Sequence, residues 1–303
     1  MNDPSQDDPP PDDPLQATAD TVTDPDETAG ETARRALGPD GAYGRLGELA
    51  IWWASVTGET APRRVLLAGG GRDVAARRPG TRALALPRGG SVDDAIRWGL
   101  RTADTAADDG TDLVLLCLDD PFSWRAIVAG LLALEPAEAC GWPQDRGMGD
   151  EQWMDEVTAL RDTLRRTRGS GTEPTRFLHA LGAPAPAAAT ALLLESTARR
   201  TPVLLDGPGA AAAGLLAMRA HYGVPRWWQV AHLGEDPLHE RLLGSLGLEA
   251  ITRLGTVPED GTASLAALAL LDTALALLAP NDLDGPAGPD GNADHFGGLD
   301  PDA

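Results

Sequence analysis

The 303-residue chain contains no lysine, so its 25 basic side chains are all arginine. Lysine is the residue that forms Schiff bases and that binds phosphate in Walker-type loops, so both kinds of site are excluded. Acidic side chains number 46, which leaves a formal net charge of −21. Nucleic acids and anionic membranes bind clustered cations, and this charge balance argues against both as partners.

Cysteines and long apolar runs are also scarce. Cys117 and Cys140 have no metal-binding spacing, and we expect two buried thiols in a reducing compartment. No apolar run approaches the roughly 20 residues of a membrane span, and the first residues lack the regions of a signal peptide. The sequence therefore predicts a cytoplasmic protein. With 42% hydrophobic but only 4% aromatic residues, its core should be aliphatic and rich in alanine.

The two ends of the chain differ from the middle in composition. Residues 1–32 are rich in Asp, Pro and Thr and hold few large apolar groups, and residues 280–303 have the same character. Segments of this kind bury too little apolar surface to fold. We therefore expect a disordered acidic N-terminal tail at 1–32, a folded domain at 33–279 and a disordered acidic C-terminal tail at 280–303.

In the middle part, short apolar runs alternate with helical patterns. Strand candidates that end in polar or glycine residues alternate with helical patterns of 10–15 residues, which indicates βαβ units and a parallel sheet. We predict an α/β fold, a Rossmann-like parallel sheet flanked by helices. The strand candidates are residues 64–68, 81–86, 112–118, 202–207, 227–232 and 250–255.

Polar side chains follow several of these predicted strands. Asp206, His232 and the pair Glu259 and Asp260 stand at or after their carboxyl ends. Ligands of parallel α/β sheets bind beyond this edge, so we expect the site there, near Gly147 and Gly149. His232 and His239 have no third ligand at a suitable spacing, so we predict no metal site.

Several short segments occur in a recognisable order. Residues 38–46 read Gly-Pro-Asp-Gly-Ala-Tyr-Gly-Arg-Leu, and residues 199–207 read Arg-Arg-Thr-Pro-Val-Leu-Leu-Asp-Gly. Further on stand Ala-His with Asp-Pro-Leu-His, Leu-Gly-Leu-Glu, Leu-Gly and Gly-Thr, at residues 231–232, 236–239, 246–249, 254–255 and 261–262. In this order and spacing the segments resemble the nicotinate-nucleotide:dimethylbenzimidazole phosphoribosyltransferases of cobalamin lower-ligand synthesis. The resemblance covers roughly residues 33–279.

This resemblance implies an enzyme with a defined reaction. A benzimidazole nitrogen displaces nicotinate from nicotinate mononucleotide, which gives α-ribazole 5′-phosphate without any cofactor. The family's base is a Glu in a Gly-Glu-Gly-Thr-Gly loop, and the gapless match places Asp260 there, with Glu259 beside it. Gly261 and Thr262 complete the loop as substrate-binding residues. The alternative for residues 259–262 is a turn followed by a helix N-cap.

The resemblance also implies a set of substrate-binding residues. Arg146, Gly147 and Gly149 match the family's Gly-Arg-Gly-Thr-Gly segment. Asp206 with Gly207 matches a strand-Asp-Gly element, for which a turn-forming Asp is the alternative, and His232 lies near the site in a matching context. Asp119 and Asp120 stand where the family has a glycine-rich nucleotide loop.

Two segments depart from the family pattern. Residues 117–124 lack the glycines of the nucleotide loop, and their two carboxylates would repel a phosphate. At residues 69–73 the family's longer segment with an Asp-His-Gly motif is missing, and the Gly-rich turn is either a phosphate cradle or a tight turn. A second hypothesis is therefore a catalytically silent relative that binds a nucleotide or a protein. The family further implies a homodimer, and a small helical part built from the two ends of the chain.

Overall fold

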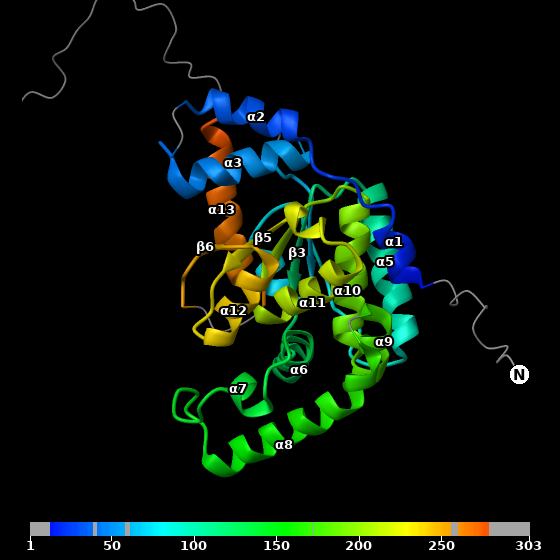
Figure 1. Ribbon diagram of the computed structural model, residues 1–303. Helices are drawn as coiled ribbons and strands as arrows, with labels where there is room; N and C mark the ends of the chain where they lie inside the picture. The colour runs from blue at the N-terminus through cyan, green and yellow to red at the C-terminus, as the bar shows by residue number, and fades with distance from the viewer. Residues whose placement is uncertain (1–12, 39–40, 58–60, 172, 256–259, 279–303) are drawn as a thin grey trace, which may run out of the picture.

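The computed structural model describes residues 13–38, 41–57, 61–171, 173–255 and 260–278. Its centre is a six-stranded sheet in which all paired strands run parallel, in the order β2-β1-β3-β4-β5-β6. The predicted α/β fold and every strand candidate are confirmed (Figure 1). The strands are β1 (Val65–Ala68), β2 (Thr81–Leu84), β3 (Leu113–Cys117), β4 (Val203–Asp206), β5 (Trp228–His232) and β6 (Ala250–Thr252).

The three central strands are buried along their whole length, whereas β6 at one edge is only half-buried. Helices cover both faces of a parallel sheet, so a central strand has no polar face and its sequence is a continuous apolar run. This explains why β1, β3 and β4 could be recognised from residues alone.

Helices α5 (Val92–Asp108), α10 (Pro184–Ala198), α11 (Gly207–Ala220) and α12 (Pro237–Leu246) pack side by side in one layer. Gly99 on α5 permits a close approach between two of them, because a Cβ there would lie 2.4 Å from the carbonyl oxygen of Ala188 on α10. The elements between the strands are α4 (Arg72–Ala75), α5 (Val92–Asp108), α6 (Pro121–Leu132), α7 (Pro136–Cys140), α8 (Asp150–Thr167), η1 (Arg168–Ser170), α9 (Pro174–Leu181), α10 (Pro184–Ala198), α11 (Gly207–Ala220), η2 (Val224–Trp227) and α12 (Pro237–Leu246).

A second group of helices joins the two ends of the chain. The helix α3 (Gly44–Thr57) packs against α2 (Glu27–Ala36) and against α13 (Thr262–Ala276), which also contacts β4 and β5. In Figure 1 these helices gather at one end of the molecule, opposite α7 and α8. The predicted small helical part is thus present.

The expectation of a disordered tail is wrong for residues 13–32. Asp13 and Asp26 accept N–H groups as N-caps of α1 (Pro14–Ala19) and α2, and Leu15 and Ala19 of α1 are fully buried. The expectation failed because it was based on the number of large apolar groups in the whole segment. The buried side chains of Leu15 and Ala19, together with the N-cap at Asp13, are enough to place a short helix. Residues 1–12 and the predicted tail at 280–303 lie outside the described residues.

We predict that Leu15→Ala lowers the free energy of unfolding. Leu15 is fully buried on α1, which packs against α10. The expected loss is about 2 kcal/mol, at the low end for a buried leucine because a short peripheral helix can shift into the space. Urea unfolding measures it, with exposed Gln16→Ala on the same helix as the control. Equal midpoints for the two variants would show that α1 adds no stability.

Both cysteines are buried and neither forms a disulfide. None of the helices in the described parts of the chain is long and apolar enough to cross a membrane.

Candidate functional site

The strand order reverses between β1 and β3, and a cavity of about 400 Å³ opens at that point. Chains leave β1 and β3 in opposite directions, so no connection covers the carboxyl ends of these two neighbours, and ligands of such sheets bind there. We call this cavity the switch-point crevice. Its lining residues are Gly69, Ala85, Leu86, Arg88, Cys117, Leu118, Asp119, Asp120, Pro121, Ala183, Pro184 and Ala185.

The Gly-rich turn after β1 forms one wall of the crevice. Gly69 has φ +84°, and a Cβ on it would lie 1.9 Å from the carbonyl oxygen of Cys117. Its N–H group donates to the carbonyl of Leu84, and the N–H of Gly71 donates to the carbonyl of Asp260 at 3.0 Å. These two N–H groups already have acceptors within the protein, which favours the tight turn over a phosphate cradle.

Asp260 therefore lies directly against the turn that lines the crevice. Its side chain is half-buried, and Oδ1 accepts the N–H of Thr262 at 2.9 Å, so the predicted turn before α13 is present. Gly261 is buried at φ +98°, where a Cβ would lie 2.7 Å from Leu67 and 3.5 Å from the Cys117 sulfur. Glu259 lies outside the described residues.

Asp119 and Asp120 both line the crevice but differ in their surroundings. Asp120 is the N-cap of α6 and accepts the N–H of Ser123 at 3.0 Å, whereas Asp119 is exposed. Arg88, an exposed residue after β2, is the cation among the lining residues. The sequence alone did not single out Arg88, because no motif surrounds it and only the folded chain brings it to the same cavity as the end of β3.

Asp206 and His232 are buried beneath this edge of the sheet, with 0% and 2% of their surface exposed. One carboxylate oxygen of Asp206, Oδ2, accepts the N–H of Ser264 on α13 at 3.1 Å. The other, Oδ1, lies 3.5 Å from Nδ1 of His232. The His232 ring is in turn edge-on to His239, with centroids 6.5 Å apart. Gly207, at φ +81°, begins α11 directly after Asp206.

Burial lowers the pKa of His239 to about 4, with a further contribution from His232. Its Nδ1 accepts the N–H of Gly234 at 3.1 Å, so the neutral ring carries its proton on Nε2. Among the described residues, no three His, Cys, Asp or Glu side chains are placed to hold a metal ion.

This shifted pKa predicts a loss of stability in acid. Unfolding returns His239 to an ordinary pKa near 6.5, so the unfolded chain binds the proton more strongly and stability falls as the pH drops from about 6.5 towards 4. From pH 7 to pH 5 this residue alone should remove about 2 kcal/mol. Urea unfolding at both pH values, compared between the wild type and His239→Gln, isolates the contribution. A pH dependence unchanged by the substitution would refute it.

The segment with Arg146, Gly147 and Gly149 lies in the loop between α7 and α8. Arg146 pairs with Glu156 on α8, which raises the pKa of Arg146, and it donates to the carbonyl of Cys140 at 3.2 Å. Gly147 and Gly149 are exposed. A cavity of about 720 Å³ separates this loop from the connection between β5 and α12, and Arg146 lines it.

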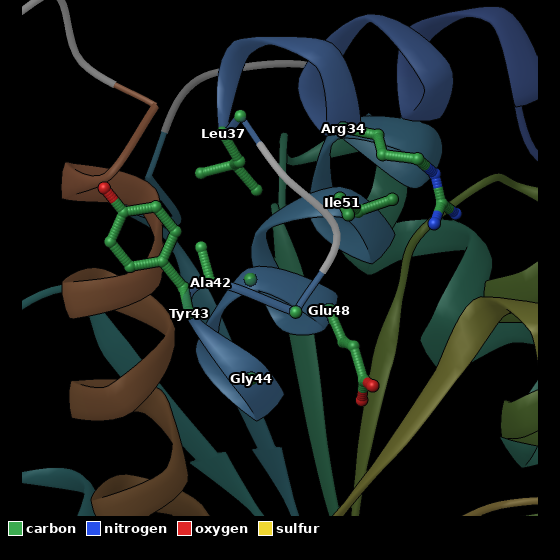
Figure 2. Close-up of a pocket in the computed structure, with 10 residues that line it drawn as sticks. Arg34, Leu37, Ala42, Tyr43, Gly44, Glu48 and Ile51 are labelled. Carbon is green, nitrogen blue, oxygen red and sulfur yellow. The ribbon is translucent and has the colours of Figure 1, made fainter.

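A third cavity, of about 240 Å³, lies between α2 and α3 (Figure 2). Its lining includes Tyr43 and Gly44 from the motif at residues 38–46, and Glu48 on α3. The neighbouring Arg45 donates to the carbonyl of Glu249, just before β6, at 2.7 Å. This motif therefore fixes α3 at the amino ends of the strands, away from the switch-point crevice.

The predicted site residues thus fall into three places. Asp119, Asp120, Asp260 and Gly261 surround or adjoin the crevice, with exposed Thr262 following at the start of α13. Asp206 and His232 are buried, and the loop of Arg146 lines a separate cavity. Two of these places are joined: the N-terminal turn of α13 meets both Asp206 and the Gly-rich turn, and Cys117 of the crevice pairs with Asp206 in the register of β3 and β4.

Comparison with known proteins adds a family to this geometry. Residues 82–282 match a family model, DBI_PRT, described as Phosphoribosyltransferase. The nicotinate-nucleotide–dimethylbenzimidazole phosphoribosyltransferase of Corynebacterium efficiens is 33% identical over 193 residues, which are 63% of this chain and 52% of that protein. Its counterpart in Streptomyces avermitilis is 34% identical over 62% of this chain and 51% of its own length. The chain therefore spans about half the length of the curated relatives it matches.

Solved structures show the same fold. The crystal structure of CobT from Thermus thermophilus superimposes with a TM-score of 0.71 at 21% identity, over 83% of this chain and 96% of that one.

Proposed function

Because the chain belongs to this phosphoribosyltransferase family, we propose that it transfers the phosphoribosyl group of nicotinate mononucleotide to 5,6-dimethylbenzimidazole or a similar base. The product is α-ribazole 5′-phosphate, with nicotinate released. The relatives' names supply this reaction, and the switch-point crevice supports it with a place for the substrates.

The observation that carries the proposal is the position of Asp260. Its backbone is held by Gly71, two residues after Gly69 on the wall of the crevice, at the carboxyl edge where such sheets bind ligands. In the reaction, one benzimidazole nitrogen attacks C1 of the ribose while the bond from C1 to nicotinate breaks. The proton on the other benzimidazole nitrogen passes to the carboxylate, for which we propose Asp260.

The phosphate of the nucleotide needs a cation or N–H groups. The family's glycine loop is replaced here by Asp119 and Asp120, and we propose that Arg88 across the crevice compensates their charge. Substrate contacts by Asp119, Asp120, Arg146, Gly147 and Gly149 stay predictions, as do those by Gly207, Gly261 and Thr262.

A catalytically silent nucleotide- or protein-binding relative is the second candidate. It is favoured by the engagement of groups that a phosphate would need: Arg146 pairs with Glu156, and an N–H group at the start of α6 donates to Asp120. Homodimerisation and cytoplasmic location stay predictions.

A turnover assay followed by a binding measurement separates the two candidates. The full chain is incubated with nicotinate mononucleotide and 5,6-dimethylbenzimidazole, and nicotinate and α-ribazole 5′-phosphate are quantified by chromatography. Equal formation of both supports the transferase. Calorimetric titration with nicotinate mononucleotide follows, and binding without turnover supports the silent relative. Absence of both leaves only a protein-binding role.

A further inference from the structure

Helix α13 has no capping side chain at its N-cap position, and the side chain of Asp260 just before it accepts only the N–H of Thr262. Its N-cap is Gly261, which has no side chain, and no side-chain cap from that position is made. The N–H groups of a first helical turn need acceptors, and the helix dipole favours a negative charge there. The carboxylate of Asp206, from the end of β4, accepts the N–H of Ser264, the third residue of α13. A buried strand residue thus caps this helix from outside.

Asp206 is also the N-cap residue of α11, although its side chain makes no capping hydrogen bond to that helix. It is fully buried. A buried carboxyl group without partners is costly, and the first turn of α13 supplies one N–H donor to it.

The surroundings of Asp206 are more polar than one cap requires. Within the described part of the chain, four buried side-chain atoms of this neighbourhood lack a hydrogen bond: Oδ1 of Asp206, Nδ1 of His232, Nε2 of His239 and Oγ of Ser264. Buried polar atoms are usually paired, so their concentration in one place calls for an explanation. Oδ1 of Asp206 and Nδ1 of His232, at 3.5 Å, need only a small rotation to form a bond.

We propose that Asp206 and His232 are positioning residues that set the N-terminus of α13 and, through it, the location of Asp260. This rests on the proposed function, because it assumes that Asp260 acts at the crevice. Asp206 holds Ser264, and Asp260 is held four residues earlier by Gly71 and Thr262. His232 flanks the oxygen of Asp206 that does not take the Ser264 N–H.

Substrate contact is the alternative role for Asp206. The two roles differ in what they change: a lost substrate contact raises KM, whereas a displaced catalytic group lowers kcat at saturating substrate. The burial of both side chains favours the second.

The structure contains a reporter that does not need activity. Gly261 covers Cys117, since a Cβ on Gly261 would lie 3.5 Å from the Cys117 sulfur. A shift of the N-terminus of α13 therefore exposes this thiol to alkylation, while Cys140 on α7 serves as the internal reference.

The experiment combines steady-state kinetics with alkylation of the native full chain by iodoacetamide, mapped by mass spectrometry. For Asp206→Ala we expect a roughly 10–100-fold fall in kcat, the usual cost of a misplaced reacting group, with KM for nicotinate mononucleotide unchanged within about twofold. Alkylation of Cys117 should be about tenfold faster, because the end of the helix opens more often, with Cys140 unaffected. Asp206→Asn keeps an acceptor for the N–H of Ser264, so it should retain most of the wild-type kcat and most of the protection of Cys117. Ser91→Ala, which removes the N-cap of α5, should change neither.

Because Asp206 is buried, Asp206→Ala can prevent folding. His232→Gln is therefore the second variant. It should lower kcat about three- to tenfold without raising KM, and it should also speed alkylation of Cys117. Unchanged alkylation of Cys117 in both variants, or a loss of activity that appears in KM, would overturn the proposal. If the wild type shows no turnover, the proposed function fails, and the alkylation rates alone then decide whether Asp206 and His232 set the position of α13.

Discussion

Asp260→Asn should reduce kcat for phosphoribosyl transfer by about 10²–10⁴, the usual contribution of a positioned proton acceptor. The amide of asparagine cannot accept the benzimidazole proton at neutral pH. It can still accept the N–H of Thr262, so the turn before α13 and the fold should persist. KM for nicotinate mononucleotide should change little, because the proton leaves only as the new bond forms.

Two further variants sharpen this test. Asp272→Asn removes a charge from α13 at a partly exposed position, where Asp272 pairs with Arg78. It should leave kcat unchanged. Glu259→Gln tests the neighbouring carboxylate. A loss of activity in Glu259→Gln but not in Asp260→Asn would assign the base to Glu259, and full activity in both would refute a carboxylate base in this loop.

The sheet could be predicted because its strands are buried. Strands β3 and β4 are continuous apolar runs of four to five residues that end in cysteine or aspartate, and short runs of this kind are typical of buried parallel strands. Such runs do not show the order of the strands in the sheet. Placement of β1 next to β3 creates the switch-point crevice, and only the folded chain shows that Arg88 and Gly69 line it.

The candidate site shows a second limit. Motif order led to Asp260, because a loop before a terminal helix keeps its spacing in sequence. The relation between Asp206 and α13 joins residues 58 positions apart and depends on the absence of a side chain at Gly261. A missing cap becomes informative only when the structure shows which distant residue replaces it. The helices at residues 13–36 were missed for a related reason, since their stability comes from caps and from contacts with other elements.

Gly69→Ala should be among the most destabilising single substitutions in this chain. Gly69 adopts φ +84°, a conformation that costs a residue with a Cβ about 1–2 kcal/mol. The added Cβ would also lie 1.9 Å from the carbonyl oxygen of Cys117 and 2.9 Å from its carbon, both of which are backbone atoms that cannot rotate away. Relief requires separation of β1 and β3, so the total loss should reach about 3–5 kcal/mol.

The same turn provides the control for this prediction. Gly71 has φ −75°, and a Cβ there would meet only Val74 at an ordinary 3.6 Å, so Gly71→Ala should change the free energy of unfolding by less than about 1 kcal/mol. Urea unfolding of the two variants measures the difference directly. Because Gly69 also lines the crevice, a folded Gly69→Ala protein should bind nicotinate mononucleotide more weakly than Gly71→Ala does. Equal stability of the two variants would mean that the β1 and β3 ends are not in contact at Gly69, and the crevice as the site of the reaction would fall with that contact.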